Sequence, residues 1–429
     1  MKLLLVNAID CNRYTETVYP SLGLAYLSSS LKNQFPDIEV KIIDRDIENI
    51  ISTYHPTAVG VSSVSQNFGR AIGIAKLCKS LNLPVFIGGV HITLLPESLP
   101  KEFDFGVYGE GEETIVEVVD FLSSGGNSGS SDMEKIKGLI LHTVDGIKLT
   151  ESRPLIEDLD SIPLPDRELL NIPIGQTTYL FTSRGCPYKC TFCASTKFWD
   201  NMRWFSAEYV VNEIEEVIEK YNPWAISFYD DLFIGNLKRL EQIVEMICEK
   251  GIHKKVKFSF SCRANLAKDK LFEVLKPLRI QMVCMGLESG CQRTLSYLKG
   301  SGITVEQNMK AVELFSKANI NVQGTFVIGS PDEEEEEILQ TLKFIKKSKL
   351  TNFEVYILSP FPGTPIWETA KQMGLVSNNM EWSKLAVDSD TPIEKRIILS
   401  KLPKERLLEL YNLFQFEKKK RRLFYYLKT

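Results

Sequence analysis

The stretch "TSRGCPYKCTFCAS", Thr182 to Ser195, gathers three of the chain's nine cysteines in one short loop. Cys186, Cys190 and Cys193 are separated by three and then by two residues. A structural zinc site usually takes four protein ligands, and neither a fourth cysteine nor a histidine lies near this loop. A redox CxxC pair would leave Cys186 without a role. Three cysteines can instead bind three irons of a [4Fe–4S] cluster, and the fourth iron then stays open to a ligand.

The composition of the 429-residue chain is that of an ordinary soluble globular protein, with 44% hydrophobic and 25% charged residues. Its length predicts two or three domains. The net charge of -4 gives no basic field that would attract nucleic acid, so no nucleic-acid partner is expected. The apolar start "MKLLLVNAID" is too short for a signal peptide, and we expect no transmembrane segment. An odd cysteine count without a signal peptide predicts a reducing, cytoplasmic setting.

The first part of the chain alternates short apolar strands with helical stretches. The predicted strands are "KLLLVN", "VKIIDRD", "AVGVSSVS", "PVFIGGV" and "FDFGVYGEGEE". This alternation predicts a parallel sheet with helices on both faces. A Gly/Ser-rich flexible loop over 123–135 and a small hairpin turning at Asp145-Gly146 follow. We therefore predict an α/β fold whose residues 1–150 form a doubly wound, Rossmann-like domain.

A proline-rich linker is predicted over 151–175, after which strands and helices alternate again over 176–375. The strands are read in "TTYLFTSRG", "WAISFYDD", "VKFSFSCRAN", "IQMVCMGLES", "INVQGTFVIGSPDE" and "FEVYILSPFPG". About six strand–helix units predict a partial (β/α)6 barrel, whose chemistry lies at the carboxyl ends of the strands. Residues 376–429 are predicted as a C-terminal helical extension, and its basic run Lys418–Arg422 is interpreted as a solvated helix end.

The motif "RGCPYKCTFC" resembles the CxxxCxxC loop of the radical SAM enzymes, which follows the first strand of a partial barrel. The resemblance extends over nearly the whole chain. It implies that Cys186, Cys190 and Cys193 are the catalytic and metal-binding residues and hold a [4Fe–4S] cluster. It also implies that the cluster binds S-adenosylmethionine and cleaves it reductively to a 5′-deoxyadenosyl radical. An electron donor such as flavodoxin or ferredoxin is implied as a partner.

The resemblance also implies cofactor-binding residues at the ends of the barrel strands. Phe192 would lie near the adenine, and Asp230 and Asp231 stand where relatives often have a Gly-Gly-Glu that holds the methionyl amine. An arginine fork matches a carboxylate, which suits Arg263 to that of the methionyl group. The remaining candidates bind the ribose, the amine or the adenine: Glu288, Ser289, Val327 and Gly329. The alternative for each is a strand-end ion pair or loop packing.

The first domain resembles the cobalamin-binding domain that precedes some radical SAM barrels. A doubly wound sheet binds its ligand where strands end, and small residues there allow close approach of the backbone. The candidate cobalamin-binding residues are Ser62, Ser63, Ser65, Gly88, Gly89, Gly109 and Gly111; the alternative is tight turns alone. The first loop, "NAIDCNRYTETVYPSLG", lacks the cobalt-binding histidine of many such domains. Two alternatives follow. Cobalamin binds without a histidine ligand to its cobalt, or the domain has retained the fold and lost the ability to bind cobalamin. His91 is interpreted as a hydrogen-bonded histidine at a helix start.

The resemblance favours an enzyme similar to the class B radical SAM methyltransferases. Methylcobalamin would supply a methyl group to an unactivated carbon of a small molecule, a lipid or a natural-product intermediate. An alternative is cyclisation, rearrangement or dehydration, with cobalamin redox-active or absent. A methylthiotransferase would need three more cysteines in the first domain, which has only Cys11 and Cys78. A sensor built on an inactive barrel is disfavoured by the intact cysteine motif.

Overall fold

The computed structural model forms two compact units. It describes residues 1–126, 130–387 and 391–426. The first unit contains Met1–Ile172 and Val376–Ala386, and the second contains Pro173–Leu375 and Val387–Thr429. Thus a short segment from beyond the barrel returns to the first unit, which no sequence pattern indicated. The domain limits inferred from composition stay a prediction.

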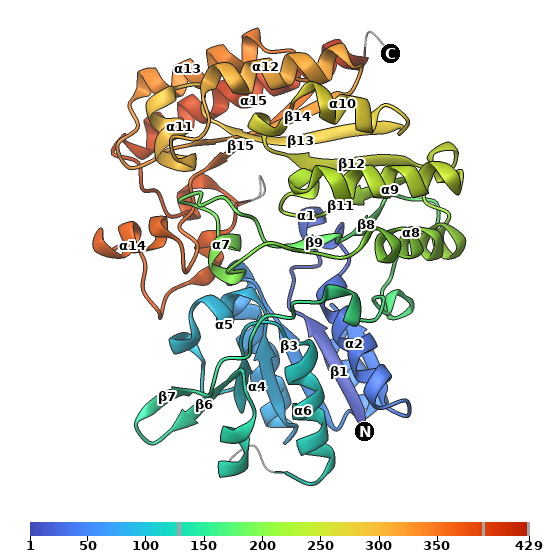
Figure 1. Ribbon diagram of the computed structural model, residues 1–429. Helices are drawn as coiled ribbons and strands as arrows, with labels where there is room; N and C mark the ends of the chain where they lie inside the picture. Colours follow the sequence, from blue (N-terminus) through green and yellow to red (C-terminus); the bar gives the residue numbers. More distant parts are fainter. Residues whose placement is uncertain (127–129, 388–390, 427–429) are drawn as a thin grey trace. The chain divides into compact units, whose positions relative to one another are not determined.

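The first unit is built on a seven-stranded sheet with the order β2-β1-β3-β4-β5-β6-β7 (Figure 1). Its strands are β1 (Lys2–Asn7), β2 (Glu39–Ile43), β3 (Ala58–Ser62), β4 (Val85–Gly88), β5 (Phe105–Val107), β6 (Leu139–Thr143) and β7 (Gly146–Leu149). Strands β1 to β5 are parallel, and the antiparallel β6–β7 pair confirms the predicted hairpin. Its turn is Val144-Asp145, one residue earlier than predicted, because Gly146 already pairs with Thr143. Because β1 lies between β2 and β3, the connections leave β1 in opposite directions. The carboxyl ends of β1 and β3 therefore form a topological switch point, where doubly wound sheets bind ligands.

Helices cover both faces of this sheet, as predicted. They are α1 (Tyr14–Thr17), α2 (Leu22–Gln34), α3 (Ile47–Tyr54), α4 (Phe68–Ser80), α5 (Val90–Leu94) and α6 (Glu112–Ser123). Leu3 and Leu5 of β1 share a core with α2 and α6, whereas Leu4 and Val6, which point to the other face, are also fully buried. A sheet buried on both faces explains why its strands are continuous apolar runs. Of the predicted loop 123–135, residues 127–129 lie outside the described residues.

The second unit contains a parallel six-stranded sheet with the order β15-β14-β13-β12-β11-β8. Its strands are β8 (Thr178–Leu180), β11 (Ala225–Phe228), β12 (Lys257–Cys262), β13 (Ile280–Glu288), β14 (Asn321–Ile328) and β15 (Asn352–Ile357). A small antiparallel pair, β9 (Ser183–Arg184) and β10 (Arg203–Trp204), follows β8. Six parallel strands with helices between them confirm the predicted partial barrel.

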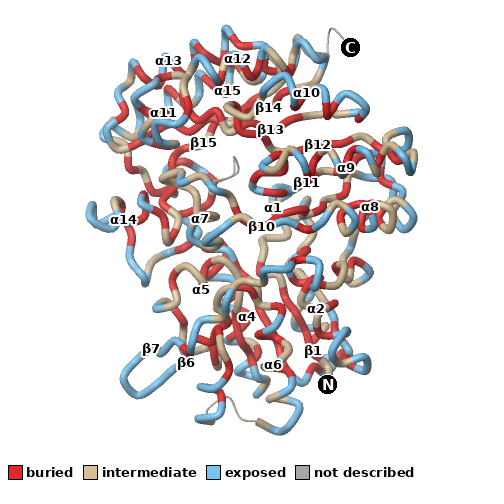
Figure 2. Tube along the Cα trace, in the orientation of Figure 1, coloured by how far each residue is buried: buried red, intermediate tan, exposed pale blue. Residues whose placement is uncertain are grey.

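The helices of the second unit alternate with its strands. They are α7 (Ser195–Phe198), α8 (Ala207–Tyr221), α9 (Leu237–Glu249), α10 (Asp269–Leu275), α11 (Gln292–Lys299), α12 (Val305–Lys317), α13 (Glu335–Lys347), α14 (Pro365–Gln372) and α15 (Lys404–Tyr426). Figure 2 shows that the strands are buried while the helices keep an exposed outer side. Phe228 stacks on Phe233 with ring centroids 4.0 Å apart, and Phe233 lies 5.4 Å from Phe260. These packed aromatic rings belong to the core beside β11 and β12.

The C-terminal helix α15 packs on α13 and β15 through buried Leu407, Leu410 and Phe414. Two members of its basic run are engaged within the unit. Lys418 Nζ contacts Glu354 at 2.5 Å, and Arg421 donates to the backbone oxygen of Leu350 at 2.7 Å. In the described part of the chain, no helix combines the length and the apolar character that crossing a bilayer requires.

Candidate functional site

The three cysteines of the motif lie in the loop between β9 and α7. Gly185 turns the chain out of β9 with a φ of 88°, and a Cβ atom there would lie 2.5 Å from the backbone oxygen of Asn201. Only glycine fits this position. Within the loop, the N–H of Cys193 donates to the oxygen of Cys190 at 3.2 Å. This turn brings the second and third cysteines together, and Cys186, like them, is a half-buried free thiol.

Hydrogen bonds from distant parts of the barrel hold this loop in place. The N–H of Thr191 donates to the oxygen of Leu298 at the end of α11 at 2.9 Å, and the N–H of Ile366 in α14 donates to the oxygen of Thr191 at 3.3 Å. The hydroxyl of Ser195 donates to Asp231 Oδ2 at 2.5 Å. The loop is therefore positioned from three strand–helix units and does not depend on its own short sequence.

Two adjacent acids follow β11 and have different surroundings. Asp230 is buried, and its carboxylate accepts the N–H groups of Thr182 and Ser183, both at 2.6 Å. Burial raises its pKa to about 6, against the lowering effect of these hydrogen bonds and of Arg239. Asp230 thus joins β11 to the chain between β8 and β9. Asp231 is exposed as a whole residue, but burial of its carboxyl group still raises its pKa, and it contacts the cysteine loop through its bond with Ser195.

Arg263 lies against the cysteine loop. Its guanidinium group stacks on the ring of Tyr188, 3.8 Å from the ring centroid. The residue is buried, with 6% of its surface exposed. Nη1 donates to Cys190 Sγ at 3.4 Å, and Nη2 donates to the oxygen of Lys299 at 3.2 Å. The structure therefore brings Arg263 to a cysteine sulfur. It places a positive charge beside a sulfur atom that would be negative as a thiolate ligand of iron.

A buried ion pair stands at the end of β13. Glu288 Oε1 lies 3.0 Å from Lys299 Nζ, and each side chain is only 7% exposed. Glu288 also has a φ of 57°, a conformation that is costly for a residue with a side chain. Lys299 Nζ fixes this geometry because it also donates to the backbone oxygen of Gly286 at 2.5 Å. Strained residues held in this way concentrate at functional sites.

Other strand-end candidates are occupied by contacts within the protein. The Ser289 hydroxyl is fully buried and lies 3.1 Å from Thr341 Oγ1. Gly329 has a φ of 83°, and a Cβ atom there would lie 3.2 Å from Leu407 of α15. Its N–H donates to Glu333 Oε2 at 2.7 Å. Val327 is buried in β14, whereas Phe192 is half-buried in the cysteine loop.

The cysteine loop has the donors of a three-cysteine cluster site. Burial raises the pKa of Cys186 and raises the pKa of Cys193 to about 11, so both thiols are protonated at neutral pH. Iron binding must therefore release protons. Among the described residues, no three His, Cys, Asp or Glu side chains form a ready-made metal-ion site. A [4Fe–4S] cluster held by these three sulfur atoms would have one iron open to a further ligand.

Four of the candidate cobalamin-binding residues meet at the ends of β3 and β4. The N–H of Ser63 donates to the oxygen of Gly88 at 3.2 Å. Gly89 has a φ of 97°, and a Cβ atom on it would lie 3.0 Å from Ser62 Oγ and from the oxygen of Ser63. The close approach that Gly89 permits is therefore one between two loops of the protein. It makes this edge of the sheet compact.

Two further glycines lie beyond β5. Gly109 has a φ of 80°, open space around its Cα, and an N–H that donates to Thr93 Oγ1 at 3.2 Å. Gly111 is the cap of α6, and a Cβ there would lie 3.1 Å from Leu27. Gly109 is needed for its backbone conformation and Gly111 for the packing of α6 on α2.

His91 at the start of α5 is fully buried and fully hydrogen-bonded. Its Nδ1 lies 3.0 Å from Ser65 Oγ, and its Nε2 lies 3.1 Å from Ser98 Oγ. Burial lowers its pKa to about 3, so the ring is neutral. The interpretation of His91 as a satisfied histidine at a helix start is confirmed. Neither of its nitrogens is available to a cobalt ion.

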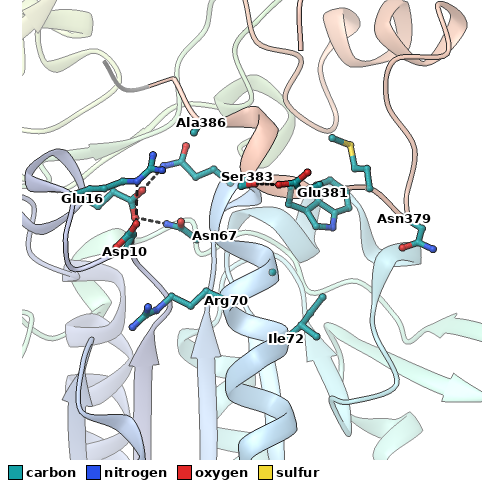
Figure 3. Close-up of a pocket in the computed structure, with 14 residues that line it drawn as sticks. Asp10, Glu16, Asn67, Arg70, Ile72, Asn379, Glu381, Ser383 and Ala386 are labelled. Carbon is teal, nitrogen blue, oxygen red and sulfur yellow. Dashed lines mark hydrogen bonds and ion pairs between the residues drawn. The ribbon is translucent and has the colours of Figure 1, made fainter. Parts of the chain in front are cut away.

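A cavity of about 490 Å³ lies at the switch point of the first unit (Figure 3). Its lining comes from three segments: Asp10–Glu16 after β1, Gln66–Ile72 after β3, and Asn379–Ala386. The carboxylate of Glu16 accepts the N–H of Asp10 at 2.8 Å and the side-chain amide of Asn67 at 2.7 Å. These bonds tie the loop after β1 to the loop after β3.

Sequence reasoning missed the polar residues of this cavity. It selected small residues after β3 and β4, whereas the cavity is lined by charged and amide side chains such as Asp10, Glu16 and Arg70. Their position directly after two neighbouring parallel strands was a usable signal. No pattern pointed to Asn379–Ala386, because that segment is distant in the chain.

The chain matches two family models. The Radical SAM superfamily model matches residues 180–345, and the B12 binding domain model matches residues 12–119. An uncharacterised methyltransferase of Pyrococcus horikoshii is 35% identical, over 90% of this chain and 86% of that protein. The anaerobic magnesium-protoporphyrin IX monomethyl ester cyclase of Cereibacter sphaeroides is 26% identical, over 82% of this chain and 60% of that protein.

The fold is similar to that of a solved structure. This structure is the radical S-adenosylmethionine methyltransferase TsrM from Kitasatospora setae with cobalamin and a [4Fe–4S] cluster bound. The TM-score is 0.72 at 19% sequence identity, and the match covers 87% of this chain and 75% of that chain. At this identity the likeness establishes the fold.

Proposed function

We propose a methyl-transfer function for this chain, which belongs to the radical SAM superfamily and carries an N-terminal B12-binding domain. The proposed reaction adds a methyl group to an unactivated carbon, with S-adenosylmethionine as the radical source and cobalamin as the methyl carrier. The observation that carries the proposal is the combination, in one chain, of the three-cysteine loop and the B12-binding domain. The 35% identity to a methyltransferase over most of both chains supports it.

In the second unit, Cys186, Cys190 and Cys193 would hold a [4Fe–4S] cluster, which supplies the electron for reductive cleavage of S-adenosylmethionine. Arg263 orients the loop through its hydrogen bond to Cys190 Sγ. Asp231 orients it from the other side through Ser195. These residues keep the loop fixed at the carboxyl ends of the strands.

Polar groups around this loop would bind the methionyl and ribose groups of S-adenosylmethionine. Glu288, held by Lys299, and the carboxylate of Asp231 are the proposed partners of its amine and hydroxyls. Phe192 and the backbone around Val327 and Gly329 are the proposed neighbours of the adenine. For Asp230 and Ser289 we propose a positioning role, because their polar atoms are occupied inside the barrel.

Cobalamin is proposed to bind at the carboxyl edge of the first sheet without a protein imidazole. Both nitrogens of His91 are engaged, and the described lining of the switch-point cavity contains no histidine. Its lining combines carboxylates, guanidinium groups and amides with the apolar side chains of Ile72, Met380 and Trp382. Such groups suit the carboxamide side chains of a corrin ring.

The proposed substrate is a small molecule, a lipid or a natural-product intermediate. Reductive cleavage of S-adenosylmethionine needs single electrons, so a flavodoxin or ferredoxin is the proposed donor. The nine free cysteines are consistent with a reducing compartment, and we propose the cytoplasm.

A second candidate is a radical cyclisation or rearrangement without methyl transfer. The 26% identity to a cyclase over 82% of this chain favours it. Product analysis separates the two functions. Methyl transfer yields S-adenosylhomocysteine together with 5′-deoxyadenosine and a methylated product. With the true substrate, accumulation of 5′-deoxyadenosine alone would contradict methyl transfer.

A further inference from the structure

One wall of the switch-point cavity comes from a part of the chain that follows the whole barrel. We call Val376–Ala386 the return segment; it belongs to the first unit although its neighbours in sequence belong to the second. Its residues Asn379–Ser383 and Ala386 line the cavity opposite the loops that follow β1 and β3 (Figure 3). A cavity at the switch point is thus completed only when the return segment is in place.

The return segment is anchored through Trp382. This indole is 5% exposed, and its ring centroid lies 4.4 Å from that of His91 and 5.6 Å from that of Phe68, both with edge-on geometry. His91 is itself fixed by Ser65 and Ser98. Val376, Leu385 and Ala386 are buried as well. An aromatic anchor of this size in a rigid setting makes the segment a fixed wall.

The side chains that face the cavity carry both signs of charge. Asp10, Glu16 and Glu381 are acidic, whereas Arg13 and Arg70 are basic. A strongly anionic or cationic ligand would meet like charges on this lining. Asp10 and Arg13 form an ion pair at 3.1 Å. A neutral ligand rich in amides can accept from Arg70 and donate to Glu16 and Glu381.

We propose that the return segment is a binding wall for cobalamin, which packs its carboxamide-bearing edge between this segment and the loops after β1 and β3. The proposal rests on the proposed function, since it assumes that cobalamin binds to the first unit. It adds the part of the site that comes from beyond the barrel. Trp382 acts as a positioning residue, while Asn379 and Glu381, exposed beside the cavity, offer polar contacts.

Titration of the full-length, iron-reconstituted protein with hydroxocobalamin tests this proposal by the visible spectrum of the bound cofactor. Trp382→Ala should raise Kd ~10-fold and speed release on desalting, because the wall loses its anchor. Trp224→Ala is the matched control: this indole is exposed in the second unit, and its loss should leave Kd unchanged. Thermal unfolding establishes that both variants are folded.

A double variant guards against misfolding of Trp382→Ala. Asn379→Ala with Glu381→Ala removes two exposed side chains and should raise Kd ~3-fold or more. Wild-type affinity in both the tryptophan variant and the double variant overturns the proposal. A wild-type protein that cleaves S-adenosylmethionine but retains no cobalamin overturns instead the cofactor assignment on which the proposal rests, and this is measured before any variant.

Discussion

The cysteine loop and the switch-point cavity differ in how their residues are distributed along the chain. All three proposed iron ligands lie between Cys186 and Cys193, and the barrel fixes their loop through backbone hydrogen bonds. The cavity is assembled from the start of the chain, from residues after β3 and from the return segment. The first site is therefore visible in eight residues of sequence, whereas the second becomes visible only after folding. Variants of one site show whether its loss changes ligand binding at the other.

The largest effect is expected from loss of the three cysteines that are the proposed iron ligands. Replacing Cys186, Cys190 and Cys193 by alanine should remove the cluster and all cleavage of S-adenosylmethionine, since no ligand remains for the irons. Cobalamin binding should persist, because the cavity uses none of these residues. Iron analysis, EPR and a deoxyadenosine assay measure the first result, and the cobalamin spectrum measures the second. Cys248→Ala, in α9, is the control with full iron content. Loss of cobalamin binding in the triple variant would break the separation of the two sites.

The next effect concerns the support of the cysteine loop. Asp230→Asn should destabilise the second unit by about 3 kcal/mol, because an amide cannot accept all the backbone N–H groups that Asp230 holds. Asp231→Asn, at an exposed neighbour, should change stability by less than about 0.5 kcal/mol. Urea unfolding followed by fluorescence measures both. Equal losses in the two variants would contradict the different roles assigned to these acids.

A smaller effect is expected on the electronic properties of the cluster. Arg263→Gln should lower its midpoint potential by roughly 50 mV, since a positive charge near Cys190 Sγ stabilises the added electron. Arg263→Lys keeps the charge and should recover part of the shift. Redox titration monitored by EPR gives the values. An unchanged potential in the glutamine variant would show that Arg263 acts only on the shape of the loop.

The smallest effect separates the two units by the sign of their pH dependence. His91 in the first unit has a pKa lowered to about 3, so its contribution to stability is present above pH 6.5 and is lost as the pH falls. Glu333 in the second unit has a pKa raised to about 7 by burial, so its contribution is present below pH 4.5 and is lost as the pH rises through 7.

Glu333→Gln therefore tests this contrast. Between pH 5 and 8, the free energy of unfolding of the second unit should change by about 1–2 kcal/mol less than in the wild type, because glutamine does not titrate. Amide hydrogen exchange at several pH values resolves the two units. The first unit of the same variant is the internal control and should keep its own slope. A second unit that retains its pH dependence would assign that dependence to other groups.

Much of the fold follows from local sequence patterns. The parallel strands, the hairpin after β5 and the six-stranded barrel were expected because buried parallel strands are short apolar runs between helices. The spacing of the cysteines made an iron–sulfur cluster the favoured interpretation of this loop, and its proposed role came from the resemblance to the radical SAM enzymes. Strand-end position also pointed to Arg263 and Glu288. It did not reveal that Arg263 bonds a cysteine sulfur, because that contact depends on how the end of β12 and the cysteine loop pack together.

The other features of the site could not be predicted from the sequence because they depend on contacts between distant residues. Gly89 was expected to let a ligand approach the backbone, but in the structure the space beside it is filled by the loop that contains Ser62 and Ser63. Asp230 and Asp231 are adjacent and chemically identical, and only burial distinguishes them. Trp382 lies in a region that read as a simple C-terminal extension. Hydrophobic periodicity predicts that such a residue is buried, but it carries no information about which core receives it.

The return segment has a consequence for biosynthesis. The polypeptide crosses between the two units three times, so the first unit is not a contiguous piece of the chain. Because the ribosome synthesises the chain from its N-terminus, the return segment is made only after the barrel. The first unit therefore cannot be complete until the barrel has been synthesised. A fragment ending at residue 172 should therefore form a sheet that captures cobalamin poorly. Co-expression of the two halves as separate polypeptides would leave the return segment on the wrong one.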